Sequence, residues 1–178
     1  MFLYGHHGKA SQNFGVYKAA VLMHVRFDGT FGFAGGIIDE GEDLLDGLHR
    51  ELEEEIAWDS EKHRITMSDY FNTQINDGKN LVLHFFTKQI PYEDLVELEK
   101  RCLTSKEFGI EVLGTVRVPL YTMNNEYGGL PAFLNNKFIG TAKQQLLLSL
   151  HHTRILNESE IEETMYKSQN MKLAPSRF

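Results

Sequence analysis

Three glutamates in the first third of the chain have a type and spacing that could do chemistry together. Glu51, Glu54 and Glu55 lie in a segment whose leucines and isoleucine recur at helical spacing. At about 100° per residue, these three side chains fall within about a third of the helix circumference, whereas Glu53 points away from them. The sequence therefore predicts one acidic patch beside the buried stripe of a helix.

Crowded carboxylates repel one another, and hard divalent cations such as Mg²⁺ or Mn²⁺ relieve that repulsion because they prefer oxygen ligands. The patch thus predicts a metal site, and a plain solvated acidic helix is the alternative. Arg50 precedes Glu54 by four residues and can pair with it, which would orient that carboxylate. Gly47 lies one turn before Glu51, where we expect it to leave a gap for a bulky anion.

The rest of the pattern predicts the elements that must position this helix. A helix is expected at 43–57 and a turn at 76–78, and the order of elements favours an α/β or α+β sandwich in one domain, residues 1–155. The acidic tail, 156–178, is compatible with a further helix. The other predicted strands are 16–25, 31–38, 64–70, 80–87 and 111–120, and the other predicted helices are 92–102 and 140–152.

Composition excludes several classes of protein. The 178 residues carry 25 acidic and 18 basic side chains, and the net charge of −7 argues against sequence-independent binding of DNA or of a membrane surface. No apolar run reaches the roughly 18 to 20 residues of a membrane span. Cys102 is the single cysteine, which excludes an internal disulfide and favours a reducing, intracellular compartment.

The glutamate helix is part of a longer pattern that resembles the Nudix box. Stretches at 26–29, 32–36, 111–122 and 128–146 are similar to the small nucleolar RNA-decapping group of Nudix hydrolases, the Nudix hydrolase 16 type. The resemblance covers residues 4–151 and implies the Nudix fold, an α/β/α sandwich with a mixed central sheet. The residues that fill the box are Gly36, Glu42, Arg50, Glu51, Leu52, Glu54, Glu55 and Trp58.

This resemblance implies a catalytic metal centre. Glu51 and Glu55 would ligate two or more Mg²⁺ or Mn²⁺ ions, together with the backbone carbonyl of Gly35 and the side chain of Gln145. Glu54 would orient or bind a further ion. Bound cations would neutralise a diphosphate and lower the pKa of a coordinated water, so that water attacks phosphorus.

A carboxylate should then accept the proton of that water, and Glu54 or Glu111 are the candidates. For Glu111, which opens a predicted strand outside the box, a surface or turn position is an equal alternative.

Further positions match residues that contact a purine nucleotide in this group. Arg26 would form charge-assisted hydrogen bonds and Phe33 would stack on the base, although a core aromatic is the alternative for Phe33. Gln74 falls where relatives carry a histidine near the metals. His6 or His7 could replace a base-contacting histidine of the relatives, and a solvated loop position is the alternative for both.

Only Ala57 departs from the box, which has glycine there. Glycine would allow a left-handed helix end, and alanine would cost on the order of 1 kcal/mol in the same geometry. We therefore expect a shifted helix end and unaffected metal binding.

Taken together, the resemblance implies a metal-dependent hydrolase that releases methylated guanosine diphosphate and 5′-monophosphate RNA from capped small nucleolar RNA or mRNA. Hydrolysis of inosine or deoxyinosine diphosphate is one alternative, and the net charge of −7 mildly favours such a small substrate. A catalytically silent, syndesmos-like interaction protein is another, although that branch has lost box glutamates. The resemblance also implies a homodimer and a nuclear or nucleolar location, with the cytoplasm as a further compartment.

Overall fold

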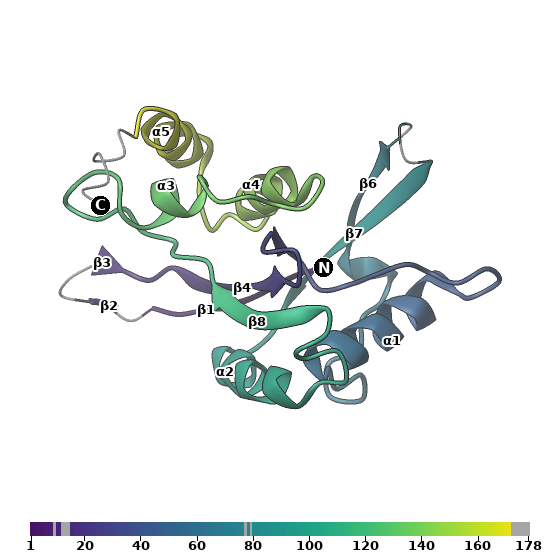
Figure 1. The fold of residues 1–178 in the computed structure, drawn as a ribbon. Coiled ribbons are helices and arrows are strands. Elements are labelled where there is room, and N and C mark those ends of the chain that lie inside the picture. Colours follow the sequence, from purple (N-terminus) through teal and green to yellow (C-terminus); the bar gives the residue numbers. More distant parts are fainter. Residues whose placement is uncertain (9, 12–14, 77, 79, 172–178) are drawn as a thin grey trace.

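The computed structural model describes residues 1–8, 10–11, 15–76, 78 and 80–171. In this part of the chain, a mixed sheet lies between two layers of helices (Figure 1). Helices α1 (Leu44–Ile56) and α2 (Tyr92–Arg101) cover one face, and the other face carries α3 (Leu130–Phe133), α4 (Ala142–His152) and α5 (Glu158–Gln169). The α/β/α sandwich expected from the sequence is confirmed.

The sheet is built around the strand β4, Ala19–Arg26. The strand order is β5-β4-β1-β7-β6, and β8 also pairs with β4. The pair β1 and β7 is parallel and the other pairs are antiparallel, so the sheet is mixed. The remaining sheet strands are β1 (Phe2–His6), β5 (Phe31–Gly32), β6 (Tyr70–Asn76), β7 (Leu81–Gln89) and β8 (Val112–Arg117), and β2 (Ala10–Ser11) pairs with β3 (Gly15–Val16) apart from them.

Alternation along β4 divides the core into two halves. Ala20 and Leu22 face the cluster that includes the apolar stripe of α1, whereas Val21 and Met23 face the cluster formed with α3 and α4. Because both faces of β4 are buried, this strand reads as a continuous apolar run in the sequence. No helix in the described part of the chain combines the length and apolarity that a membrane crossing requires.

The strand expected at 31–38 is mostly wrong, because only Phe31–Gly32 pairs with β4. Gly35 adopts a φ of 127°, and its N–H donates to the carboxylate of Glu55 instead of to a neighbouring strand. At Gly35 and Gly36 the chain therefore leaves the sheet and passes over α1.

The strand expected at 64–70 is also wrong. The side chain of Asp69 accepts from the Thr66 N–H at 3.0 Å, which completes a capping box around a short 3-10 turn, Met67–Asp69. Strand β6 begins only at Tyr70. The predicted turn at 76–78 falls partly on residue 77, which lies outside the described residues.

The acidic tail contains a helix that packs on the domain. Asn157 caps α5 by accepting from the Glu160 N–H, and Thr164 and Ser168 are buried on its inner face. The Asn135 side-chain amide donates to the Ser168 carbonyl at 2.9 Å. Helix α5 is therefore tied to the layer formed by α3 and α4, which the sequence pattern did not indicate.

Helix α1 ends where the box places its end, so the expected shift is wrong. Ala57 adopts the left-handed region at φ 53°, and its N–H donates to the Glu53 carbonyl at 3.0 Å. The Trp58 N–H donates to the Leu52 carbonyl, and the buried Trp58 ring anchors the chain just beyond the helix. Burial of Trp58 thus holds alanine in a strained conformation.

Ala57→Gly should therefore stabilise the protein. Left-handed alanine is strained by about 1–2 kcal/mol, and the greater freedom of glycine in the unfolded chain offsets about 0.4–1 kcal/mol of this. We expect the free energy of unfolding in urea to rise by about 0.5–1 kcal/mol. Ala142→Gly, at a buried position of α4 without positive φ, should lower it. An unchanged or lower stability of Ala57→Gly would contradict a strained helix end.

Candidate active site

The candidate site forms where the loop after β5 crosses helix α1. Glu55 is the most buried of the box glutamates, with 4% of its surface exposed. One of its carboxylate oxygens accepts a hydrogen bond from the Gly35 N–H at 2.8 Å. Burial raises the pKa of Glu55 to about 7, and the Gly35 bond opposes this shift only in part. Glu55 is therefore a carboxyl group that exchanges its proton near neutral pH.

Glu51 contacts the next residue of the same loop. A Cβ atom placed on Gly36 would overlap the Glu51 carboxylate, so only glycine permits this approach. Glu51 and Glu55 therefore contact neighbouring residues of the loop, Gly36 and Gly35, whose Cα atoms are about 3.8 Å apart. Two carboxylates thus flank one glycine pair.

Arg50 holds the loop and the helix together. Its guanidinium donates to both carboxylate oxygens of Glu42 at 2.9 Å, to Glu51 at 2.8 Å and to the Ile37 carbonyl at 3.1 Å. These bonds lower the pKa of Glu42 to about 2. Glu54 lies farther from Arg50, at 3.4 Å. The expected Arg50–Glu54 pair exists, but the bidentate contact with Glu42 dominates.

Gly47 does not leave the gap that the sequence suggested. A Cβ atom there would lie 2.6 Å from Ile38 Cδ1 and 2.7 Å from a carboxylate oxygen of Glu42. The loop therefore fills the space above Gly47. Glycine at this position allows the loop to pack on the helix. The expectation that Gly47 leaves a gap for a bulky anion is therefore wrong.

Glu54 faces a different segment from its two neighbours. Its carboxylate pairs with Lys106, which holds the pKa of Glu54 below its usual range. The Glu107 N–H also donates to the Glu54 carbonyl at 3.0 Å, so the loop between α2 and β8 rests on the end of α1. The sequence pattern did not indicate a role for Lys106, because this residue is far from the box along the chain.

The three glutamates share a helix face, as expected, but their main partners differ. Like charges held close together repel, and the carboxylates are stabilised by Arg50 at Glu51, by Lys106 and more weakly Arg50 at Glu54, and by the Gly35 N–H at Glu55. Among the described residues, no three Asp, Glu, His or Cys side chains converge in a group suited to a metal ion.

Two further residues of β4 surround Glu55. His24 is 3% exposed, and its Nδ1 lies 3.7 Å from the Glu55 carboxylate. Burial lowers the pKa of His24 to about 4, so between about pH 4 and 7 this contact joins two neutral groups and is not an ion pair. The positive charge of Arg26, two residues further along β4, also acts to lower the pKa of Glu55.

Arg26 and Phe33 both retain accessible surface next to the loop. The guanidinium of Arg26 lies 5.5 Å from the ring centre of Phe27, and its Nε has no hydrogen-bond partner among the described residues. Phe33 is half-buried and packs against Phe2 and Phe85, with ring centres 5.9 and 5.2 Å apart. One part of the Phe33 ring therefore belongs to the core, as the alternative interpretation held.

The two predicted glutamines lie on the side of the sheet that carries α4. The Thr141 hydroxyl, at the start of α4, donates to the Gln74 side chain at 2.6 Å, and Gln145 is buried one turn later. The structure thus brings Gln74 and Gln145 toward the same helix end.

Glu111 is an exposed residue just before β8. Its carbonyl accepts from the Phe27 N–H at 3.0 Å, which places it beside the turn that follows Arg26. His6 and His7 lie at the other end of the sheet, because His6 pairs with Ala19 at the start of β4. Neither histidine is near the loop that contacts Glu55.

The burial of Glu55 predicts a pH-dependent stability for the metal-free protein. The folded-state pKa of about 7 exceeds the usual value of 4.5, so the folded protein binds the proton more tightly than the unfolded chain does. The stabilisation present below about pH 4.5 is therefore lost as the pH rises through 7.

Relative to Glu55→Gln, which stays neutral, wild type should lose on the order of 3 kcal/mol between about pH 5 and 8, measured by urea unfolding with a chelator present. The matched control Glu53→Gln lies on the exposed face of the same helix and should follow wild type. A constant difference between wild type and Glu55→Gln across this range would exclude the raised pKa.

Comparisons with known proteins show what this chain is similar to. A family model described as Nudt16-like, U8 snoRNA-decapping enzyme-like, matches residues 1–156. The U8 snoRNA-decapping enzyme of Homalodisca vitripennis is 49% identical over 125 residues, which are 69% of this chain and 67% of that protein. The enzyme of the same name from Xenopus laevis is 40% identical over 87% of this chain and 74% of its own length.

A second kind of relative also matches. The human Tudor-interacting repair regulator protein is 39% identical over 150 residues, which are 83% of this chain and 69% of that protein. The family model nevertheless spans most of the chain, including the box helix and the glycine loop that contacts it. The chain therefore belongs to the Nudt16-like, U8 snoRNA-decapping enzyme-like family.

Proposed function

We propose that this protein is a Nudix hydrolase that cleaves the diphosphate linkage of guanosine-capped RNA and releases methylated guanosine diphosphate and 5′-monophosphate RNA. The observation that carries this proposal is the contact of Glu51 and Glu55 with the Gly35–Gly36 backbone. It occurs in a chain that is 40–49% identical to several proteins named U8 snoRNA-decapping enzyme.

The donor atoms at this contact fit divalent cations. Mg²⁺ and Mn²⁺ prefer carboxylate and carbonyl oxygens, and a buried carboxyl group with a pKa near 7 is one that a cation would stabilise as the anion. Glu51 and Glu55 would hold two or more such ions, with the Gly35 carbonyl and Gln145, and Glu54 would orient or bind a further one. The bound ions would supply charge neutralisation for the diphosphate and an activated water.

The chain's own residues would hold the nucleotide and move the proton. The accessible parts of the Arg26 side chain and of the Phe33 ring suit a phosphate or base edge and a base plane, respectively. Glu111 is a better candidate for the proton acceptor than Glu54, because the contacts with Lys106 and Arg50 lower the pKa of Glu54 and so weaken it as a base. Gln74 would complete the substrate side near α4.

Two alternatives differ from this proposal in substrate or in activity. Inosine or deoxyinosine diphosphate would use the same carboxylates, and the net charge of −7 favours a small substrate. An interaction protein without activity would follow the relatives named Tudor-interacting repair regulator protein. Retention of Glu51, Glu54 and Glu55 favours catalysis over that role.

The deciding experiment compares turnover of capped RNA and inosine diphosphate by wild type with Mg²⁺ or Mn²⁺. Capped RNA should be the better substrate by kcat/KM. Glu55→Gln should reduce this value by at least about a hundredfold, because it removes a charged oxygen at the buried end of the site. Glu53→Gln should match wild type. A preference for inosine diphosphate would show that this nucleotide, and not capped RNA, is the substrate. Activity on neither substrate would favour the interaction protein.

The glycine contact gives a separate prediction for metal binding. Gly36→Ala should push the Glu51 carboxylate aside and weaken Mn²⁺ binding by about tenfold or more in calorimetry. Gly114→Ala is the matched control, because a Cβ atom at Gly114 meets nothing within 4 Å. Equal Mn²⁺ affinities for the two variants would show that the approach to Gly36 does not position a ligand.

A homodimer and a nuclear or nucleolar location complete the proposal. Exposed Ile75 and Val82 face each other across the β6–β7 hairpin and supply an apolar pair that a second subunit would cover. A nuclear location fits a small nucleolar RNA substrate, and the cytoplasm would fit an mRNA cap.

A further inference from the structure

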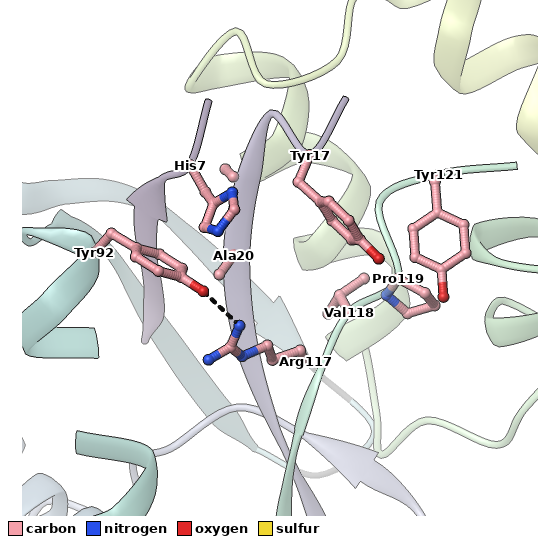
Figure 2. Close-up of a pocket in the computed structure, with 9 residues that line it drawn as sticks. His7, Tyr17, Ala20, Tyr92, Arg117, Val118, Pro119 and Tyr121 are labelled. Carbon is pink, nitrogen blue, oxygen red and sulfur yellow. Dashed lines mark hydrogen bonds between the residues drawn. The ribbon is translucent and has the colours of Figure 1, made fainter. Parts of the chain in front are cut away.

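A second cavity lies at the end of the sheet away from the box helix. Its volume is about 270 Å³, and its walls are formed by His7, Tyr17, Tyr92, Arg117 and Tyr121 over a floor of short apolar side chains. We call this cavity the aromatic slot (Figure 2). It is separated from the candidate active site by the length of β4, because Ala19 lines the slot and Arg26, at the other end of the strand, is about 23 Å away at about 3.3 Å per residue.

Four aromatic rings form a connected row at the slot. His7 and Tyr92 are 4.1 Å apart between ring centres, His7 and Tyr17 are 5.9 Å apart, and Tyr17 and Tyr121 are 5.6 Å apart. Figure 2 shows the rings in the order Tyr92, His7, Tyr17, Tyr121, with Ala20, Val118 and Pro119 below them in this view. The segments that carry the rings are far apart along the chain, so the fold has assembled an aromatic row beside an apolar floor.

Arg117 supplies a fixed cationic edge to this cavity. Its guanidinium donates to both carboxylate oxygens of Glu99, at 2.6 and 2.5 Å, and to the Tyr92 hydroxyl at 2.8 Å. It also lies 5.4 Å from the centre of the Tyr92 ring. Arginine has five N–H groups, so two remain for a ligand, and the pair with Glu99 holds their direction.

This composition selects a planar, hydrogen-bonding ligand. The volume is just below the roughly 300 Å³ at which pockets for drug-sized ligands begin, so one flat ring system fits better than a larger molecule. Arg117 disfavours a cation, and Glu99 neutralises the attraction for a bare anion. Bases of single-stranded RNA stack on tyrosine and histidine rings and accept hydrogen bonds from arginine.

We propose that the aromatic slot binds one base of the RNA chain downstream of the cap, while the cap nucleotide occupies the site at Glu51 and Glu55. This inference rests on the proposed decapping function. A chain with a net charge of −7 is poorly suited to holding RNA by its phosphates, whereas stacking on aromatic rings does not depend on a basic surface. The slot therefore supplies affinity for RNA in a form that an acidic protein can use.

The test uses binding of an uncapped, 5′-monophosphate oligoribonucleotide to the full chain, followed by fluorescence anisotropy. Tyr17→Leu keeps apolar volume but removes an aromatic face, and it should weaken RNA binding by at least about fivefold. Tyr166→Leu changes a tyrosine that is 69% exposed on α5, and its affinity should stay within about twofold of wild type. Thermal unfolding of each variant shows whether it is folded.

A second measurement needs no variant. Photo-crosslinking of wild type to RNA with a photoreactive base should label Tyr17, Tyr92 or Tyr121, also when inosine diphosphate is present in excess to fill the catalytic site. Crosslinks confined to other surfaces, or equal RNA affinities of wild type and folded Tyr17→Leu, would overturn the proposal. If Tyr17→Leu weakened the binding of a proline-rich peptide but left RNA affinity unchanged, that result would also overturn the proposal and would favour a protein partner.

The two proposals can fail separately. Uncapped RNA contains no cap to cleave, so its binding is independent of hydrolysis. Cleavage of capped RNA without binding in the slot would overturn only the slot, whereas slot binding without cleavage would overturn only the decapping reaction.

Discussion

The packing of helix α1 against the backbone of Gly35 and Gly36 is the contact on which the candidate site depends. A buried carboxyl group requires a hydrogen-bond donor, and the Gly35 N–H is that donor for Glu55. A side chain at Gly36 would displace the Glu51 carboxylate, since its Cβ would occupy the space of that group. Two glycines thus bring two acidic groups to one short stretch of backbone.

Arg50 offsets the repulsion between these closely spaced carboxylates. Its bidentate pair with Glu42 ties the loop to the helix, and its bond to Glu51 compensates one of the crowded charges. Lys106 does the same for Glu54 from a separate loop. Only Glu55 lacks a full cationic partner of this kind, which is why burial can raise its pKa to about 7. The electrostatic character of the site follows from this unequal compensation.

Strand β4 links the two ends of the molecule. Its carboxyl end presents His24 and Arg26 to the buried glutamate, and its amino end forms the floor of the aromatic slot. Because β4 is buried on both faces and paired with β1, β5 and β8, we expect the distance between its two ends to be fixed. Relatives with two different names match this chain.

The sequence by itself determined the box helix, the two-sided burial of β4 and the helices near 92–102 and 140–152, because these depend on local periodicity and on the spacing of side chains along one element. Tertiary structure decided the features that require distant partners. Ala57 stays left-handed because Trp58 is buried, and Gly47 is covered because the loop packs over it. Lys106 reaches Glu54 from a separate loop, and α5 packs against α3 and α4. Periodicity cannot report such contacts, since they depend on which surfaces the folded chain brings face to face.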